Sequence, residues 1–211
     1  YYKKPEFSFC AIGDYFYDMH PLQCEPFSGG KDLVNRINNL ITEGTGGPGI
    51  EESYDLAALY YAHNVKMPNA VKPLFIFIGD EGFYDTVDPR AANSFSHVFL
   101  DQPLPASEAI KDLQQKYSVY CIRKQFDSAP EESQIHTQWE NFLGEDYVKI
   151  LNKPERVVDV ILGIMSIETE KQDHFEKELN WRQTDEQVET VMKSLKKIRK
   201  KTKNGMKKIG K

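Results

Sequence analysis

Two acidic stretches of the sequence follow apolar runs and carry oxygen atoms that could hold a metal ion. Asp80 and Glu81 end the apolar run FIFIG, and Asp14 ends the run FCAIG, with Asp18 in the loop that follows. Carboxylate oxygens suit Mg²⁺, which uses few protein ligands and keeps several bound waters. Each aspartate could instead cap a helix or accept hydrogen bonds from loop amides, so two interpretations of these residues are open.

A glycine-rich stretch, EGTGGPGIEES, lies between these acidic groups in the sequence. Its glycines match the G-x-G-x-x-G spacing of dinucleotide-binding loops, which also require a strand before the glycines and a helix after them. The preceding residues, Lys31 to Glu43, instead have the periodicity of an amphipathic helix, and Glu51 and Glu52 would repel a pyrophosphate. A nucleotide site is therefore disfavoured. The glycines provide either a sharp turn that a ligand can approach or a simple flexible connection.

Other catalytic motifs are missing from the sequence. It contains no G-x-S-x-G, H-E-x-x-H or Walker motif, no cysteine pair with zinc-ligand spacing, and five histidines without a ligand spacing. The enzyme alternative is a metal-dependent hydrolase or phosphoryl-transfer enzyme that uses Asp80 and Glu81, together with Asp14. Because no catalytic motif is found, we expect a protein that is not an enzyme.

The acidic and glycine-rich stretches must be positioned by the elements around them, and apolar patterns predict that strands and helices alternate. Continuous apolar runs predict buried strands over residues 7–14, 72–82, 117–126 and 148–151. Helical spacing of apolar residues predicts helices over residues 31–43, 51–64, 107–116, 154–171 and 184–198. This order predicts an α/β, Rossmann-like, three-layer α/β/α fold with a mostly parallel central sheet and C-terminal helices. The carboxyl ends of parallel strands share one edge, which would bring Asp14 and Asp80 together.

The composition is that of a globular protein with a sizeable core. The chain has 211 residues, of which 40% are hydrophobic. No apolar run approaches the roughly 18 residues of a membrane span, and no secretory leader is visible. Because the three cysteines are odd in number and two of them lie in apolar runs, we expect reduced thiols and a cytoplasmic location.

The C-terminal tail differs in charge from the rest of the chain. From Lys193 to Lys211 there are ten lysines and arginines and no acidic residue, which leaves 17 basic against 32 acidic residues elsewhere. Such a tail could bind nucleic acid or another anionic partner, or serve as a nuclear import signal, or it could be a solvated helix end. The residues expected to contact an anionic partner are Lys196, Lys197, Arg199, Lys200 and Lys201.

Three segments resemble successive parts of the von Willebrand factor A (vWA) domain in its cytosolic form: FSFCAIGDYFYDMHPLQCEPF, EGTGGPGIEESYDLAALYY and KPLFIFIGDEGFYD. In that family, Mg²⁺ in a metal-ion-dependent adhesion site (MIDAS) at the sheet edge binds a carboxylate of a partner protein. The resemblance therefore implies a protein–protein interaction module. The metal ligands that it implies are Asp80, the loop residue Thr45 with Glu52 and Ser53 as alternatives, and Asp14. The partner-binding residues that it implies are Glu81, Asp18, Gly46 and Gly47.

The chain departs from the vWA pattern at its start. No D-x-S-x-S motif occurs in the 211 residues, and FSFCAIGD resembles the second strand of that fold. A parallel sheet without its middle strand would expose two rows of unpaired backbone groups. We therefore predict that another segment fills the gap, either upstream residues of the same protein or a second polypeptide.

The resemblance also suggests two parts in the chain. Residues 1–170 form the vWA-like domain, which ends with the strand at 148–151 and the helix after Pro154. Residues 171–211 form a helical extension with the basic tail. In this extension, Thr184 to Gln187 read as a capping box, followed by an apolar stripe that is either core or a partner-binding surface.

Overall fold

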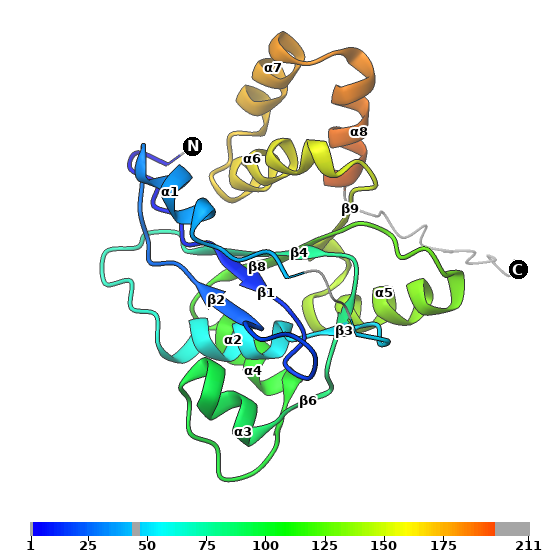
Figure 1. The fold of residues 1–211 in the computed structure, drawn as a ribbon. Coiled ribbons are helices and arrows are strands. Elements are labelled where there is room, and N and C mark those ends of the chain that lie inside the picture. Colours follow the sequence, from blue (N-terminus) through cyan, green and yellow to red (C-terminus); the bar gives the residue numbers. More distant parts are fainter. Residues whose placement is uncertain (1, 44–46, 197–211) are drawn as a thin grey trace, which may run out of the picture.

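The computed structural model describes residues 2–43 and 47–196, and the predicted mixed α/β class is confirmed (Figure 1). The strands are β1 (Cys10–Ile12), β2 (Leu22–Cys24), β3 (Glu51–Glu52), β4 (Leu74–Gly79), β5 (Gly82–Phe83), β6 (Thr86–Val87), β7 (Leu104–Pro105), β8 (Ser118–Arg123) and β9 (Val148–Ile150). The α-helices are α1 (Asp32–Asn38), α2 (Tyr54–His63), α3 (Pro89–Ala91), α4 (Ala106–Gln114), α5 (Ala129–Leu143), α6 (Val157–Glu168), α7 (Gln172–Arg182) and α8 (Asp185–Leu195).

A small parallel sheet forms the centre of the molecule, in the order β4-β8-β9. Leu74 pairs with Ser118 at one end of the β4–β8 ladder and Gly79 pairs with Arg123 at the other. The remaining strands form separate pairs, of which β1–β2 and β6–β7 are antiparallel and β3–β5 is parallel. The parallel sheet is thus confirmed for three strands, whereas the predicted strand near the N-terminus joins an antiparallel hairpin instead.

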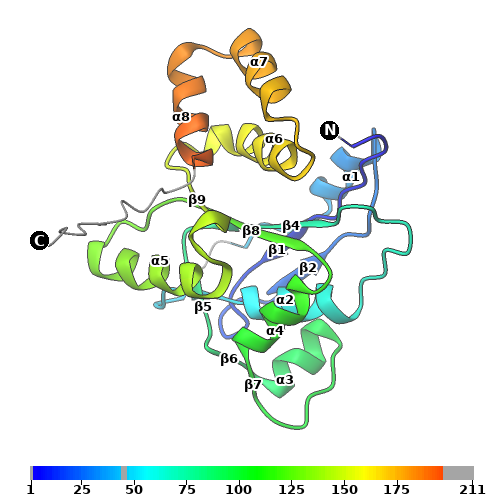
Figure 2. The ribbon, with the colours of Figure 1, turned by 180° about the vertical axis from the view of Figure 1, so that it is seen from behind.

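Helices cover both faces of this sheet (Figures 1 and 2). Because successive strand residues point to opposite faces, β8 directs Val119 and Cys121 into one core and Tyr120 and Ile122 into another. The first core contains α2, α4 and α5, and the second contains α6, α7 and α8. Both faces of β8 are buried, which explains why its sequence is almost continuously apolar.

The C-terminal helices pack closely on one another. Gly163 of α6 lies against the side chain of Leu195 in α8, where a larger residue would collide with it. The predicted capping box at the start of α8 is confirmed, since Thr184 and Gln187 each satisfy the backbone of the other. In the apolar stripe of α8, Val191 and Leu195 are buried in the second core, so this stripe belongs to the core.

The strand β4 lies at an edge of the described sheet, although its sequence is too apolar for an exposed edge. It pairs with β8 on one side and with no described strand on the other. The hairpin β1–β2 lies near this open side (Figure 1). Here Cys10 and Cys24 face each other in register with their Sγ atoms 3.1 Å apart, and all three cysteines are free thiols.

Among the described residues, no helix combines the length and the apolar character needed to span a membrane.

Candidate functional site

The loops after β1 and β4 meet the start of α2 at one end of the sheet, which we call the acidic rim. Its described acidic members are Asp14, Asp18, Glu51, Glu52, Asp80 and Glu81. Asp14 is buried at the centre of these loops. Its carboxylate accepts 2.9 Å hydrogen bonds from the Tyr84 hydroxyl at both oxygens and a 2.9 Å bond from the Phe16 amide. Asp14 is therefore held in place by a loop 70 residues away.

Ser53 lies at the start of α2 and contacts the loop that contains Asp14. Its buried hydroxyl accepts a 2.9 Å hydrogen bond from the Tyr15 amide, and its own amide donates a 3.2 Å bond to the Gly13 carbonyl. These two bonds tie the end of β1 to the first turn of α2. The structure thus brings together Asp14 and Ser53, two of the residues predicted as metal ligands.

Glu52 and Glu81 form a carboxyl pair at the same rim. Burial, a hydrogen bond with Glu81 and the charges of Glu81, Asp14 and Asp18 together raise the pKa of Glu52 to about 8. Burial is also the main cause that raises the pKa of Glu81. Two carboxyl groups in hydrogen-bonding contact cannot both ionise easily, so near neutral pH this pair shares a proton. The pairing follows from β3–β5, which aligns Glu51 with Gly82.

The turn after β4 is fixed through its main chain. Arg123, which is fully buried, donates a 2.8 Å hydrogen bond to the Asp80 carbonyl, and the Trp139 indole donates a 2.9 Å bond to the Glu81 carbonyl. Arg123 also forms two bonds to Glu132, of 3.2 and 2.9 Å. These contacts set the position of the turn, while the Asp80 side chain is half-buried at the rim.

The predicted partner-binding residues border the same centre. Asp18 accepts a 2.7 Å hydrogen bond from the Asp14 amide. Gly47 packs against Tyr17 and the Asp14 carboxylate so closely that a side chain at this position would collide with them. The glycine-rich loop therefore does reach the acidic rim. Thr45 and Gly46 lie outside the described residues.

One buried acid was missed by the sequence reasoning. Asp55 in α2 is completely buried, and this burial, with a smaller effect of the Asp14 charge, raises the pKa of Asp55 to about 8. The tyrosine and phenylalanine rings of Tyr15, Phe16 and Tyr84, which pack on one another beside Asp14, were also missed. The motif DYFYD contains two of these rings, but nothing in the sequence links it to Tyr84.

The metal and tail predictions are only partly covered by the structure. Within residues 2–43 and 47–196, no three Asp, Glu, His or Cys side chains are close enough together to hold a metal ion. Lys196 is exposed after the end of α8. The other tail residues, Lys197, Arg199, Lys200 and Lys201, lie outside the described residues.

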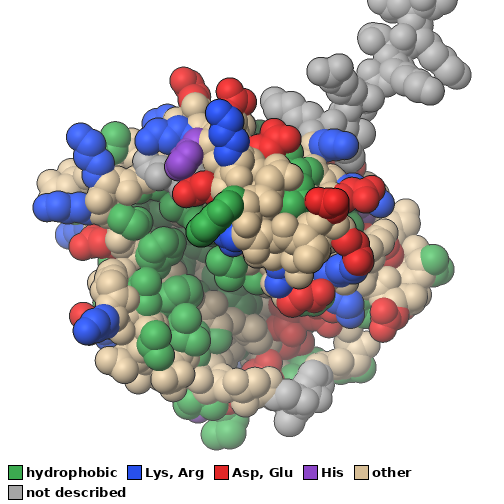
Figure 3. Space-filling view, turned by 90° about the horizontal axis from the view of Figure 1, so that it is seen from above, with side chains coloured by type: hydrophobic (Ala, Val, Ile, Leu, Met, Phe, Trp, Pro, Cys, Tyr) green, Lys and Arg blue, Asp and Glu red, His purple; other side chains and the backbone are tan. Residues whose placement is uncertain are grey.

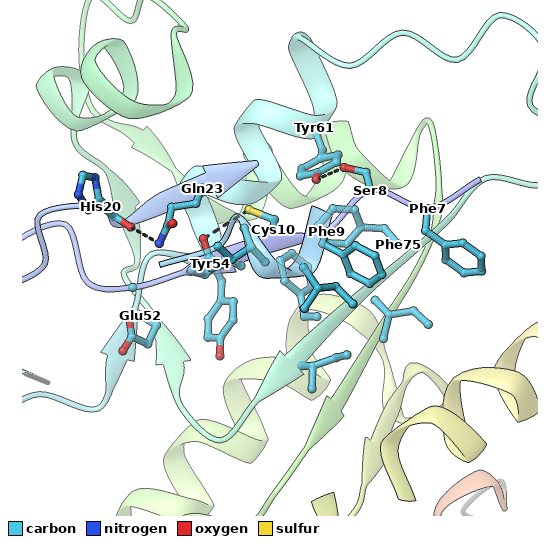
Figure 4. A pocket seen from close by; sticks show the side chains of 18 of the residues that line it. Phe7, Ser8, Phe9, Cys10, His20, Gln23, Glu52, Tyr54, Tyr61 and Phe75 are labelled. Carbon is cyan, nitrogen blue, oxygen red and sulfur yellow. Dashed lines mark hydrogen bonds between the residues drawn. The ribbon is translucent and has the colours of Figure 1, made fainter. Parts of the chain in front are cut away.

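A cavity of about 770 Å³ opens beside the rim, between β1 and β4. The face of the molecule in Figure 3 is hollowed, and hydrophobic side chains gather around the hollow. In Figure 4, Ser8 points toward Tyr61, with which it shares a 2.6 Å hydrogen bond, while Phe7 and Phe9 point away from that ring. Asp18, Glu43 and Glu52 line the cavity where it meets the rim.

Comparison of the chain with protein-family models, with curated proteins and with solved structures finds no match.

Proposed function

We propose that this chain is a protein–protein interaction module of vWA type that binds a partner carboxylate through Mg²⁺ at the acidic rim. One observation carries the proposal: the β3–β5 pairing holds Glu52 beside Glu81 at the rim, where burial, the hydrogen bond with Glu81 and the charges of Glu81, Asp14 and Asp18 raise the pKa of Glu52 to about 8. A divalent cation would offset these negative charges. Neither a covalent step nor a catalytic base is needed for this function.

No three acidic side chains of the described residues meet closely enough to enclose an ion, so bound waters would complete the shell, but the donor atoms at the rim are of the type that Mg²⁺ prefers. They are carboxylate and hydroxyl oxygens, and Oε2 of Glu52 is buried without a hydrogen-bond partner among the described residues. Glu52 and Glu81 would hold the ion with Ser53 and bound waters, because Mg²⁺ commonly uses one or two protein carboxylates. When bound, the ion would supply a positive charge and an open coordination position for the partner's carboxylate.

The vWA assignment rests on the residue patterns of the chain and agrees with several features of the fold. These are the parallel sheet, the helices on both of its faces and the carboxylates after β1 and β4. The space between β1 and β4 agrees with the expected absence of a central strand. The finer description, a three-layer Rossmann-like vWA fold, is part of this proposal.

Calorimetric titration of residues 1–211 with MgCl₂ at pH 7 tests the proposal. We expect saturable binding that EDTA reverses. Binding should release about one proton per ion at pH 7, because the ion displaces the proton that Glu52 and Glu81 share, and release should vanish above about pH 9. Titrations in buffers with different ionisation enthalpies measure this proton release.

The variant Glu52→Gln should weaken Mg²⁺ binding by about tenfold or more. The matched control Glu189→Gln changes an exposed glutamate of α8 and should bind as the wild type does. The proposal fails if Mg²⁺ produces neither heat nor a change in melting temperature. If the Mg²⁺-loaded protein instead hydrolyses a phosphate ester and Asp80→Ala abolishes this turnover, the enzyme alternative replaces it.

A further inference from the structure

The open edges of β1 and β4 face the same cavity, and their backbone groups on that side pair with no other strand of residues 2–43 and 47–196. In the β4–β8 ladder, the carbonyls of Pro73 and Gly79 accept bonds from Ser118 and Lys124. The odd-numbered residues of β4 therefore pair with β8, which leaves the N–H and C=O groups of the even-numbered residues on the opposite edge. These residues are Leu74, Ile76 and Ile78, and all three line the cavity.

The hairpin β1–β2 presents a second free edge in the same way. Gly13 donates its amide hydrogen to the Pro21 carbonyl, and the Phe9 carbonyl accepts from Glu25, so alternate residues from Phe9 to Gly13 pair with β2. Cys10 and Ile12 then direct their backbone groups to the other edge. Both residues line the cavity. We call the space between these two edges the strand slot.

The two edges run in the same direction. Tyr61 contacts Ser8 before β1 and the Phe75 ring in β4, so the starts of both strands lie at the same level. Their ends reach the acidic rim together, where Ser53 binds the Gly13 carbonyl and Glu52 contacts Glu81. A single strand in the slot could therefore pair with both β1 and β4, and a parallel direction would continue the pattern of the parallel sheet β4-β8-β9.

The slot is apolar above and below the plane of the sheet. Phe75, Phe77 and Tyr54 line it on the side of the first core. On the other side, Ile37, Ile41 and Ile78 line it while each is about half exposed, at 49%, 52% and 51%. A strand buried on both faces is continuously apolar. A strand that occupies the slot should therefore also be continuously apolar.

We propose that the strand slot binds an extended segment of a partner protein, which adds a parallel strand between β1 and β4. A strand residue occupies about 3.3 Å along the strand, about 4.8 Å between strands and about 10 Å through the sheet. The 770 Å³ cavity thus accommodates about five residues. Because Asp18, Glu43 and Glu52 line the end at the rim, the segment should carry lysine or arginine directly after its apolar residues.

A designed peptide tests this proposal in the absence of metal. The probe is a fluorescein-labelled peptide with the sequence Lys-Val-Ile-Val-Ile-Val-Lys-Lys, titrated with residues 1–211 in EDTA and followed by anisotropy. We expect saturable binding. N-methylation of alternate residues removes the hydrogen-bond donors toward one edge but keeps the apolar side chains, so it should weaken binding by about tenfold or more.

Protein variants and hydrogen exchange locate the peptide. Ile78→Lys places a charge at the slot and should weaken binding by about tenfold, whereas the control Val71→Lys changes an exposed residue outside the slot and should not. Melting curves of both variants verify folding. Saturating peptide should slow exchange at the amides of Cys10, Ile12, Leu74, Ile76 and Ile78.

Several outcomes would overturn the proposal. One is the absence of saturable binding, another is equal affinity for the peptide and its N-methylated form, and a third is unchanged exchange at the five amides. If these amides are already protected in the free chain, light scattering separates two causes. If light scattering shows a dimer, a second copy of the chain fills the slot. If it shows a monomer, a segment of the same chain fills it. Since the experiment contains no metal, its result is independent of Mg²⁺ binding at the rim.

Discussion

Asp55 shows how burial controls the charge of a single side chain near the acidic rim. The folded protein raises the pKa of Asp55 to about 8, from an ordinary value of 3.8, because the carboxyl group is removed from water. Between these two pH values the folded state holds a proton that the unfolded state has released. The free energy of unfolding must therefore fall as pH rises through this range.

The variant Asp55→Asn should remove this part of the pH dependence. It keeps the shape of the side chain but cannot ionise, so at pH 8 it should melt about 10–20 °C above the wild type, and at pH 4 the difference should disappear. Melting curves from pH 4 to pH 8 provide the measurement. The exposed control Asp101→Asn should follow the wild-type curve. Equal pH dependence of wild type and Asp55→Asn would show that Asp55 is ionised in the folded protein.

Arg123 links three elements through one buried guanidinium group. It contacts Glu132 in α5 and the Asp80 carbonyl after β4, while its own main chain ends β8. Lysine carries the same charge but cannot form a planar fork of donors.

Arg123→Lys should therefore lower the free energy of unfolding by about 2–3 kcal/mol, and Arg123→Met by about 3–5 kcal/mol because Glu132 would lose its charged partner. Urea denaturation measures both values. The exposed Arg90→Lys serves as the control. If Arg123→Lys were as stable as the wild type, the two bonds to Glu132 would not contribute to stability as a pair.

Part of the site was predictable from single residues, and part was not. Carboxylates after apolar strands predicted that Asp14 would lie at the same sheet edge as Asp80 and Glu81, because strand ends share an edge, whereas Glu52 was suggested only by the vWA resemblance. The contacts of Tyr84 with Asp14 and of Arg123 with Asp80 join residues 70 and 43 positions apart. Such pairs depend on the packed fold and leave no periodic pattern in one sequence.

At the scale of elements, the close approach of α6 and α8 depends on Gly163. Alanine is the better helix former by about 1 kcal/mol, yet a methyl group here would collide with Leu195. We expect Gly163→Ala to lower the melting temperature by about 3–6 °C.

A double mutant tests the cause of that loss. If the collision with Leu195 is responsible, Gly163→Ala should cost less in a Leu195→Ala background than in the wild type. Thermal unfolding of the four proteins in this cycle gives the coupling energy. Additive effects would mean that the two residues do not interact.

The elements themselves were predicted unevenly. The strands β4, β8 and β9 and the helices α2, α4, α6 and α8 follow from clear apolar periodicity. The strand β2 was missed because it has only three residues, and the 15-residue helix α5 was not recognised because apolar side chains are sparse in its first half. Neighbouring strands cannot be deduced from periodicity, so the open edge of β4 was suggested by the vWA resemblance alone.

At the scale of the whole molecule, the C-terminal helices share a core with the sheet. Phe175 and Leu179 of α7 and Leu195 of α8 are buried with Tyr120 and Ile122 of β8. A protein that ends at residue 170 should therefore expose this face of the sheet and melt at least about 10 °C below the full chain. A protein that ends at residue 196 keeps these contacts and should melt within about 2 °C of it. If all three proteins had similar melting temperatures, residues 171–196 would be an extension that does not stabilise the rest of the chain.

The strand slot also separates two parts of the molecule that should differ in local stability. The parallel strands β4, β8 and β9 lie between two cores, whereas the hairpin β1–β2 lacks a ladder to them in the described residues. We therefore expect the hairpin to open locally more often than the rest of the chain, although side-chain hydrogen bonds tie both ends of β1 to other elements. A protease that recognises extended backbone should therefore cut near the hairpin first, and a strand bound in the slot would close that route by making both parts open together.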